Sequence, residues 1–67
     1  MYSVDNNFTY HAPKGDQPGR YQAIWEMTKV LADFLIATCP DSRERSLALT
    51  HLETAIFWAN ASIARNE

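Results

Sequence analysis

Apolar residues recur three or four positions apart between Gly19 and Thr38, a spacing that predicts an α-helix over this segment. The main apolar row consists of Ile24, Met27, Leu31, Phe34 and Leu35, widened on one side by Ala23, Val30 and Ala37. A different face carries Tyr21, Trp25, Lys29 and Ile36. Because large side chains occupy two faces of the helix, we expect packing partners on both.

Local residue types define the ends of this helix. Asp16 is a capping type and Pro18 suits a first helical turn, so the helix is predicted to begin near these residues. It is predicted to end at Cys39, because the residue before Pro40 avoids the helical region.

A second helix is predicted to start directly after Pro40 and to continue to Asn66. Asp41 can accept a hydrogen bond from the Glu44 amide while the Glu44 side chain reaches back, an arrangement similar to a capping box. Because only a few residues connect the two helices, they are predicted to run antiparallel.

The second helix presents apolar residues on more than one side. Its predicted hairpin face consists of Ala48, Leu49, Leu52, Ala55, Ile56, Ala59 and Ile63. Trp58 shares another face with Leu47, His51, Thr54, Ala61 and Arg65, and Phe57 shares the opposite flank with Thr50, Glu53, Asn60 and Ala64. Neighbouring positions point about 100° apart, so one partner helix cannot cover both Phe57 and Trp58. We therefore expect at least one additional interface, made with other copies of the chain.

Residues 1–18 show no helical period and contain Pro13, Gly15 and Pro18. We interpret them as an extended N-terminal arm that packs on the helices or on a neighbouring subunit, with a frayed terminus as the alternative. Residues 19–67 are predicted to form the helical hairpin domain. The predicted fold is all-α: a single domain built as an antiparallel two-helix hairpin with an extended arm, assembled as a homo-oligomer.

The composition also favours assembly. The chain has 67 residues, of which 46% are hydrophobic, yet a hairpin of this size buries little apolar surface by itself. Cys39 is the one cysteine, so no internal disulfide can form. His11, His51 and that thiol make a poor zinc set. Oligomerisation is the remaining way to stabilise so short a chain.

Charge and hydropathy narrow the range of partners. The net charge is −2 and there is no run of basic residues, which argues against binding to DNA or RNA. A small phosphate ligand needs only one or two placed cations and is not excluded. No apolar stretch is long enough to span a membrane, no signal peptide is evident, and the unpaired Cys39 suits a reducing cytosol.

The sequence does not indicate catalysis. Ser42, Ser46 and Ser62 have no evident histidine or lysine partner, and Glu44 and Glu53 do not share a helical face. We therefore predict no catalytic residue, no metal site and no cofactor.

Two groups of residues on the helices are candidates for ligand binding. Tyr21, Trp25 and Lys29 form a row in which the rings can stack on a nucleobase and the ammonium can meet a phosphate. The alternative is that both rings pack at an interface and Lys29 reaches solvent. Asn60 and Arg65 form an anion clamp if subunits converge at the end of the second helix, whereas otherwise Arg65 complements the helix dipole.

A third candidate group lies where the arm meets the first helix. Tyr10 and Pro13 can form a stacking wall, with Lys14 and Arg20 reaching a phosphate. The alternative is a solvated loop without a ligand.

Longer runs of sequence are similar to a known family. They are Tyr10-His11-Ala12-Pro13, Arg20-Tyr21-Gln22-Ala23-Ile24, Pro40-Asp41-Ser42-Arg43-Glu44, Ser46-Leu47-Ala48, Leu52-Glu53 and Trp58-Ala59-Asn60-Ala61-Ser62-Ile63-Ala64-Arg65. Over residues 8–66 the chain resembles the helical hairpin domain of bacteriophage sponge proteins. These proteins sequester the cyclic nucleotide signals of two anti-phage defences, CBASS and Thoeris.

The resemblance implies a function and an assembly. Such sponges form hexamers in the cytoplasm of the infected host and bind cyclic dinucleotides, cyclic trinucleotides or glycocyclic ADP-ribose between protomers, without cleaving them. The resemblance implies base stacking for Phe8, Tyr10 and Pro13, a phosphate contact for Lys29, and polar positions near subunit junctions for Asn60 and Arg65. Trp25 departs from the pattern, because related sequences often carry arginine there; a phosphate contact is then lost or replaced by stacking.

Two other functions remain open at this point. The first is a helical phage oligomer that acts only through protein–protein interaction. The second is a helical hairpin that binds nucleic acid, against which the acidic balance argues.

Overall fold

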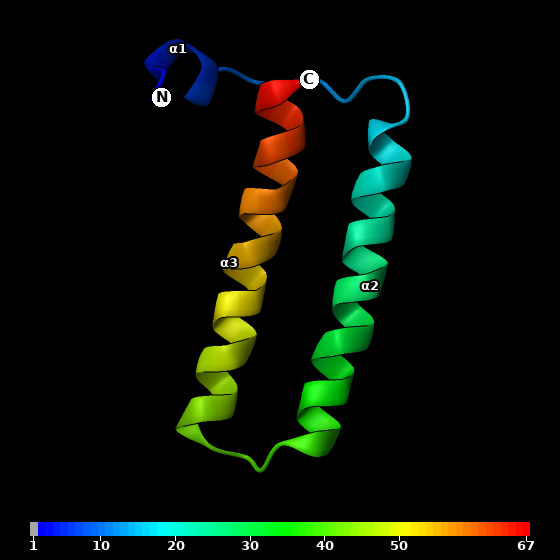
Figure 1. Cartoon of the computed structure of the whole chain (residues 1–67), viewed down its shortest axis with the longest axis vertical. Helices are drawn as coiled ribbons and strands as arrows, with labels where there is room; N and C mark the ends of the chain where they lie inside the picture. Colours follow the sequence, from blue (N-terminus) through cyan, green and yellow to red (C-terminus); the bar gives the residue numbers. More distant parts are fainter. Residues whose placement is uncertain (1) are drawn as a thin grey trace.

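The computed structural model describes residues 2–67 and contains three helices over that range: α1 (Val4–Asn7), α2 (Gln17–Thr38) and α3 (Arg43–Asn66). Helices α2 and α3 lie side by side and antiparallel, and the arm that carries α1 crosses the C-terminal end of α3 before it enters α2 (Figure 1). The described residues include no β-strand and extend 42 × 25 × 15 Å. The predicted all-α hairpin is confirmed.

Helix α2 begins at Gln17, which confirms the predicted start near Asp16 and Pro18. Pro18 lies in the first turn, as expected, but the Asp16 side chain makes no capping hydrogen bond. Its carboxylate instead lies 3.3 Å from Arg20 Nε. At the other end Cys39 is extended, with φ −95° and ψ 140°, and its amide donates to the Leu35 carbonyl. The predicted stop before Pro40 is confirmed.

The cap of α3 differs from the predicted capping box. Ser42, not Asp41, is the capping residue: its hydroxyl accepts a hydrogen bond from the Arg45 amide at 3.1 Å. Ser42 has the extended backbone that this position requires, so the helix begins one residue later than the Asp41 prediction. The freed Asp41 carboxylate pairs with the Arg45 guanidinium at 3.0 Å. Arg45 also donates to the carbonyls of Ile36 and Cys39, which the end of α2 leaves without helical partners.

Partly buried positions on both helices recur three or four residues apart, as in a two-stranded helical packing. On α3 the predicted hairpin face is confirmed for Leu49, Leu52, Ile56, Ala59 and Ile63, and it is wrong for Ala48 and Ala55, which are exposed. On α2, where the sequence did not indicate which apolar row faces α3, Ile24 and Leu35 are partly buried, whereas Ala23, Met27, Val30, Phe34 and Ala37 are exposed. Leu31 lies at the edge and is 45% exposed.

The packed stripe on α2 is narrow. The side of α2 that faces α3 includes Thr28 and Ala32 rather than the largest apolar residues. The Thr28 hydroxyl donates to the Ile24 carbonyl at 2.6 Å, so its polar group is satisfied within the helix. Met27, Val30 and Phe34 form a separate row, which we call the outer apolar row. Its side chains are 75%, 70% and 61% exposed.

The single hairpin has a very small core. Among the described residues Ile56, at 8% exposed, is the one buried apolar side chain. Their positions about 100° apart predicted that one partner helix would leave Phe57 or Trp58 uncovered, and in the single hairpin both are exposed. The Trp25 and Phe57 rings meet edge to face across one flank, with centroids 6.5 Å apart. So much exposed apolar surface on a folded chain is typical of an interface.

The N-terminal arm is not wholly extended. Ser3 caps a single turn, α1, by accepting from the Asn6 amide at 3.2 Å, and Thr9 donates to the Asp5 carbonyl after it. One turn is too short to give a helical period in the sequence, which is why the prediction missed it. The arm contacts the hairpin, because the Asn6 side-chain amide donates to the Arg65 carbonyl at 3.0 Å. No helix in the described part of the chain is long and apolar enough to cross a bilayer.

Candidate functional site

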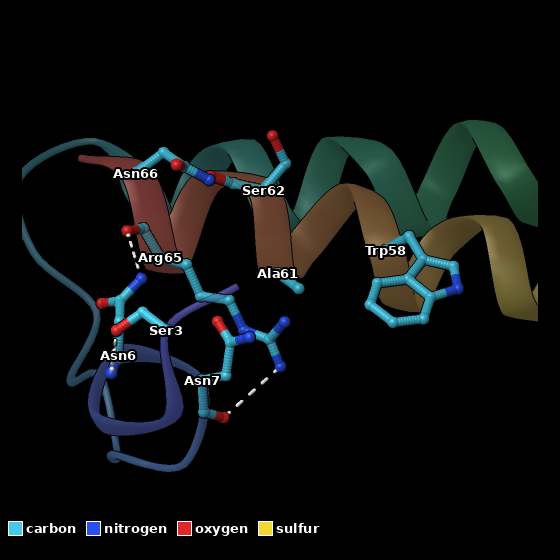
Figure 2. A pocket seen from close by; sticks show the side chains of 8 residues that line it. All are labelled: Ser3, Asn6, Asn7, Trp58, Ala61, Ser62, Arg65 and Asn66. Carbon is cyan, nitrogen blue, oxygen red and sulfur yellow. Dashed lines mark hydrogen bonds between the residues drawn. The ribbon is translucent and has the colours of Figure 1, made fainter. Parts of the chain in front are cut away.

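Three cavities surround the last two turns of α3, where the arm crosses the hairpin. We call the first the arm cavity, because it lies between α1 and α3 (Figure 2). It has a volume of about 290 Å³ and is lined by Ser3, Asn6, Asn7, Trp58, Ala61, Ser62, Arg65 and Asn66. Side-chain amides and hydroxyls thus surround one cation and one large ring.

Arg65 is the charged group of the arm cavity. Its side chain extends along the cavity between Asn7 and Trp58 (Figure 2), and its guanidinium carbon lies 6.0 Å from the Trp58 ring centroid. One guanidinium nitrogen makes a long contact of 3.5 Å with the Asn7 carbonyl. Among the described residues no carboxylate pairs with Arg65. Most of its five N–H donors are therefore available to an anion, and its place in the last turn of α3 also suits the helix dipole.

The second cavity, which we call the flank cavity, lies on the side of the hairpin where Trp25 meets Phe57. It has a volume of about 350 Å³ and is lined by His11, Tyr21, Trp25, Asn60, Ala61 and Ala64. Tyr21 and Trp25 come from α2, Asn60 and the two alanines from α3, and His11 from the arm. The His11 ring is fixed by a 2.8 Å hydrogen bond between Nε2 and the Asn6 carbonyl.

Asn60 is the most informative residue of the flank cavity. Its side-chain oxygen is buried and has no hydrogen-bond partner within the chain. Buried amide oxygens are almost always paired in folded proteins. The unpaired acceptor therefore calls for a donor from outside the chain, and the aromatic rings beside it offer faces on which a flat group can stack.

A third cavity of about 280 Å³ lies on the outer side of α3, lined by Thr54, Phe57, Trp58, Ala61 and Arg65. Ala61 lines all three cavities, and its small side chain leaves the space between the large rings open. In the described part of the chain no group of three or more His, Cys, Asp or Glu side chains could hold a metal ion.

Lys14 and Arg20 lie away from these cavities, in a cluster around Glu67. The Arg20 guanidinium donates to both carboxylate oxygens of Glu67, at 3.0 Å for Oε2, and the Gln17 side-chain amide donates to Oε1 at 3.2 Å. Lys14 Nζ donates to the main-chain carbonyl of Glu67 at 2.7 Å. The hydrogen bond from Arg20, followed by that from Gln17, lowers the pKa of Glu67 below its ordinary value, and the same pairing raises the pKa of Arg20.

The structure brings together some of the residues that the sequence nominated. Tyr21, Trp25 and Asn60 meet in the flank cavity, and Arg65 lies in the arm cavity. Lys29 is exposed and lines neither cavity. The side chains of Phe8 and Tyr10 are 77% and 84% exposed, and Pro13 is also exposed, so these three residues form no wall within one chain.

Sequence reasoning missed several residues of the cavities and of the charged cluster. Asn6, Asn7 and His11 come from the arm, and Glu67 completes the cluster with Lys14 and Arg20. A signal was present in the pair of adjacent asparagines, since side-chain amides in a terminal arm can satisfy the open carbonyls at a helix end. The role of Glu67 depends on the start of α2 lying beside the end of α3, which no local pattern encodes.

Comparison of the chain with known protein families identifies one match. A family model described as the Acb2/Tad1 hairpin domain matches residues 2–64, nearly the whole chain. No curated protein and no solved structure matches the chain. The family consists of non-catalytic sponge proteins, which agrees with a site built from aromatic rings, amides and one unpaired arginine. The chain therefore belongs to the Acb2/Tad1 hairpin-domain family, the anti-CBASS and anti-Thoeris sponges.

Proposed function

We propose that this protein is a phage sponge that binds cyclic nucleotide immune messengers in the cytoplasm of the infected host and leaves them intact. Membership of the Acb2/Tad1 family supports a sponge-type anti-defence role and non-catalytic binding. The messengers we propose are cyclic dinucleotides, with cyclic trinucleotides or glycocyclic ADP-ribose as further ligands. Sequestration lowers the free messenger concentration, so the host effector is not activated.

The observation that carries the proposal is the unpaired oxygen of Asn60, a residue that lines the flank cavity together with Tyr21 and Trp25. A nucleobase has a flat face for stacking and, in adenine and guanine, an exocyclic amino group that donates hydrogen bonds. The flat face can stack on the aromatic rings of the flank cavity, and the amino group can donate to the unpaired oxygen of Asn60. Binding would supply the missing donor to Asn60, which removes the cost of a buried unpaired acceptor.

Phosphate groups of the same ligand need cations. Arg65 is the cation of the arm cavity without a carboxylate partner, and Ala61 lines both this cavity and the flank cavity. Lys29 lies one helical turn beyond Trp25 on α2 and is exposed. We assign both as phosphate ligands, and we assign the exposed Phe8, Tyr10 and Pro13 to stacking positions that a second copy of the chain completes.

We further propose a homo-oligomer, with the hexamer that the family resemblance implies. The outer apolar row of Met27, Val30 and Phe34 lies on α2 and the exposed Trp58 on α3, and separate contacts between copies would cover them. Two kinds of contact between copies allow a closed ring or stacked trimers. The open cavities around α3 would then be completed by neighbouring protomers.

Isothermal titration of the purified protein with 3′,3′-cyclic dinucleotides, cyclic trinucleotides and glycocyclic ADP-ribose tests the proposal. We expect tight binding of at least one, and recovery of unchanged ligand after denaturation. An Asn60→Ala variant should bind more weakly, whereas Gln22→Ala, on the exposed side of α2, should not. A folded protein that binds nothing in the panel contradicts the proposal.

The outer apolar row also supports a second candidate function. A row with side chains 61% to 75% exposed could bind a host protein instead of another copy of the chain. This alternative predicts no nucleotide binding and a stable complex with one host protein, which a Phe34→Ser substitution should abolish in a pull-down.

A further inference from the structure

A cluster of donors converges on one carboxylate where the start of α2 meets the end of α3. Arg20 donates through both terminal nitrogens, Gln17 through its amide, and Lys14 to the neighbouring main-chain carbonyl of Glu67. Two parallel N–H groups of an arginine fit the two oxygens of a carboxylate, and they fit two oxygens of a phosphate equally well. The cluster therefore has the chemistry of an anion receptor.

Gln17 shows that this receptor is built into the fold. It is the most buried polar residue described, at 3% exposed. The Lys14 amide donates to its side-chain oxygen at 3.1 Å, which fixes the amide so that the nitrogen points at Glu67. Gln17 is thus held in place before any anion arrives, and Arg20 lies one turn further along α2 with its Nε 3.3 Å from the exposed Asp16 carboxylate.

The backbone at the start of α2 supports the same arrangement. Gly15 has a φ of 57°, in the left-handed region that favours glycine, and the turn closes with the Gln17 amide donating to the Lys14 carbonyl at 3.0 Å. This turn returns Lys14 to the side of Arg20. The Gln17 and Arg20 amides are already paired with the Lys14 and Asp16 carbonyls, so the start of α2 adds its helix dipole to the site rather than a row of open amides.

We propose that Lys14, Gln17 and Arg20 form a phosphate-binding site that the Glu67 carboxylate occupies as an internal competitor. The Arg20 and Glu67 side chains are 39% and 41% exposed, so water screens their pairing and the closed state exceeds the open one only severalfold. A phosphate group, free or carried on a nucleotide, can then displace Glu67. Occupation by Glu67 lowers the apparent phosphate affinity about two- to sixfold.

Titration with inorganic phosphate at constant ionic strength tests this site without any cyclic nucleotide, so its failure is separate from failure of the proposed sponge function. Glu67→Gln should bind inorganic phosphate about two- to sixfold more tightly than the wild type. Glu53→Gln, which makes the same change in net charge on an exposed position of α3, should bind like the wild type. Adding Arg20→Gln to Glu67→Gln should remove the gain.

The outcomes separate the interpretations. Equal affinities of the wild type and Glu67→Gln, or no binding to either, overturn the proposal and leave the cluster as a structural clasp. An equal gain in Glu53→Gln, or a gain that survives Arg20→Gln, also overturns it, because net charge alone would then explain the effect. Adenosine monophosphate is titrated in parallel. If it binds more tightly than inorganic phosphate, the site is one for a nucleotide phosphate; if it does not, the site is one for free phosphate. Circular dichroism of each variant establishes that the helices are intact.

Discussion

Substitution of Trp58 tests most directly whether the hairpin is a monomer or part of an oligomer. In the isolated chain its side chain is 64% exposed, on the side of α3 away from α2. A tryptophan buries about 150–250 Å² when fully covered, so about 100–160 Å² remains for a partner to cover. At about 25 cal/mol/Å² that area corresponds to about 2.5–4 kcal/mol per chain, an upper estimate for Trp58→Ala in an assembly that covers the ring fully. In a monomer the same substitution should cost less than about 1 kcal/mol.

Two variants separate the interface from the hairpin core. Ile56 is 8% exposed within one chain, so Ile56→Ala should cost about 2–5 kcal/mol at every protein concentration. Trp58→Ala should instead shift the concentration at which the oligomer forms. Denaturant unfolding at several protein concentrations, with sedimentation velocity for mass, measures both effects.

The result that would refute the reasoning is equally specific. If the wild type sediments with the mass of one chain and its unfolding midpoint does not depend on concentration, no partner covers Trp58. If the wild type is an oligomer but Trp58→Ala leaves the assembly unchanged, the oligomer uses the outer apolar row alone. A Met27→Ala variant, on that row, then identifies the interface, because Met27 is 75% exposed in the single chain.

The remaining predictions concern the caps, the charged cluster and the anion site. Ser42→Ala should lower the free energy of unfolding by about 0.5–2 kcal/mol in thermal denaturation, because the Arg45 amide loses its acceptor, and a loss no larger than that of Asp41→Ala would contradict the assigned cap. The pKa of Glu67 is held below its ordinary value of 4.5 by Arg20, so its contribution is complete above that pH and is lost as the pH falls through the lower, folded pKa. The wild type should therefore be more stable than Glu67→Gln at neutral pH and equal to it in strong acid; a gap that persists in acid would show that the charge is not responsible. Arg65→Ala should leave the helical circular dichroism unchanged and weaken binding of a phosphate-containing ligand about tenfold or more, whereas Arg43→Ala, an exposed arginine at the start of α3, should not change it.

Local rules account for most of the fold. Proline at position 40 stops α2 and a short polar turn reverses the chain, so the antiparallel hairpin follows from the sequence. The pattern could not say which apolar row of α2 faces α3, because two rows have helical spacing and the row with the larger side chains, Met27 and Phe34, is the exposed one. Hydrophobicity measures the free energy of transferring a side chain out of water. Which residues lie between α2 and α3 also depends on how closely the two backbones approach, and a close approach favours small side chains such as Thr28 and Ala32.

The sequence indicated which residues could bind a ligand better than it indicated which of them lie together. Tyr21, Trp25 and Asn60 meet because α2 and α3 are antiparallel, and that meeting could be inferred from the hairpin. The separation of Lys14 and Arg20 from the cavities could not, since it depends on Glu67, which is 47 residues from Arg20 in the chain. The carboxylate partner of a cation has to be known before its role is judged, because a phosphate must displace that partner to bind.

This distinction decides how the two kinds of cation in the protein can act. Arg65 faces an asparagine carbonyl and a tryptophan ring, neither of which neutralises its charge, so an anion can bind without displacing a carboxylate. Arg20 is already paired, so any phosphate that binds there must compete with Glu67, and its affinity depends on how often that pair opens. A ligand with phosphates at both places would bind Arg65 first, because no ion pair has to break there. It would bind Arg20 only if that contact offsets the loss of the Arg20–Glu67 pair. The flank and arm cavities are therefore where binding should begin, and a substitution at Glu67 should alter phosphate affinity while leaving the pairing of a base with Asn60 unchanged.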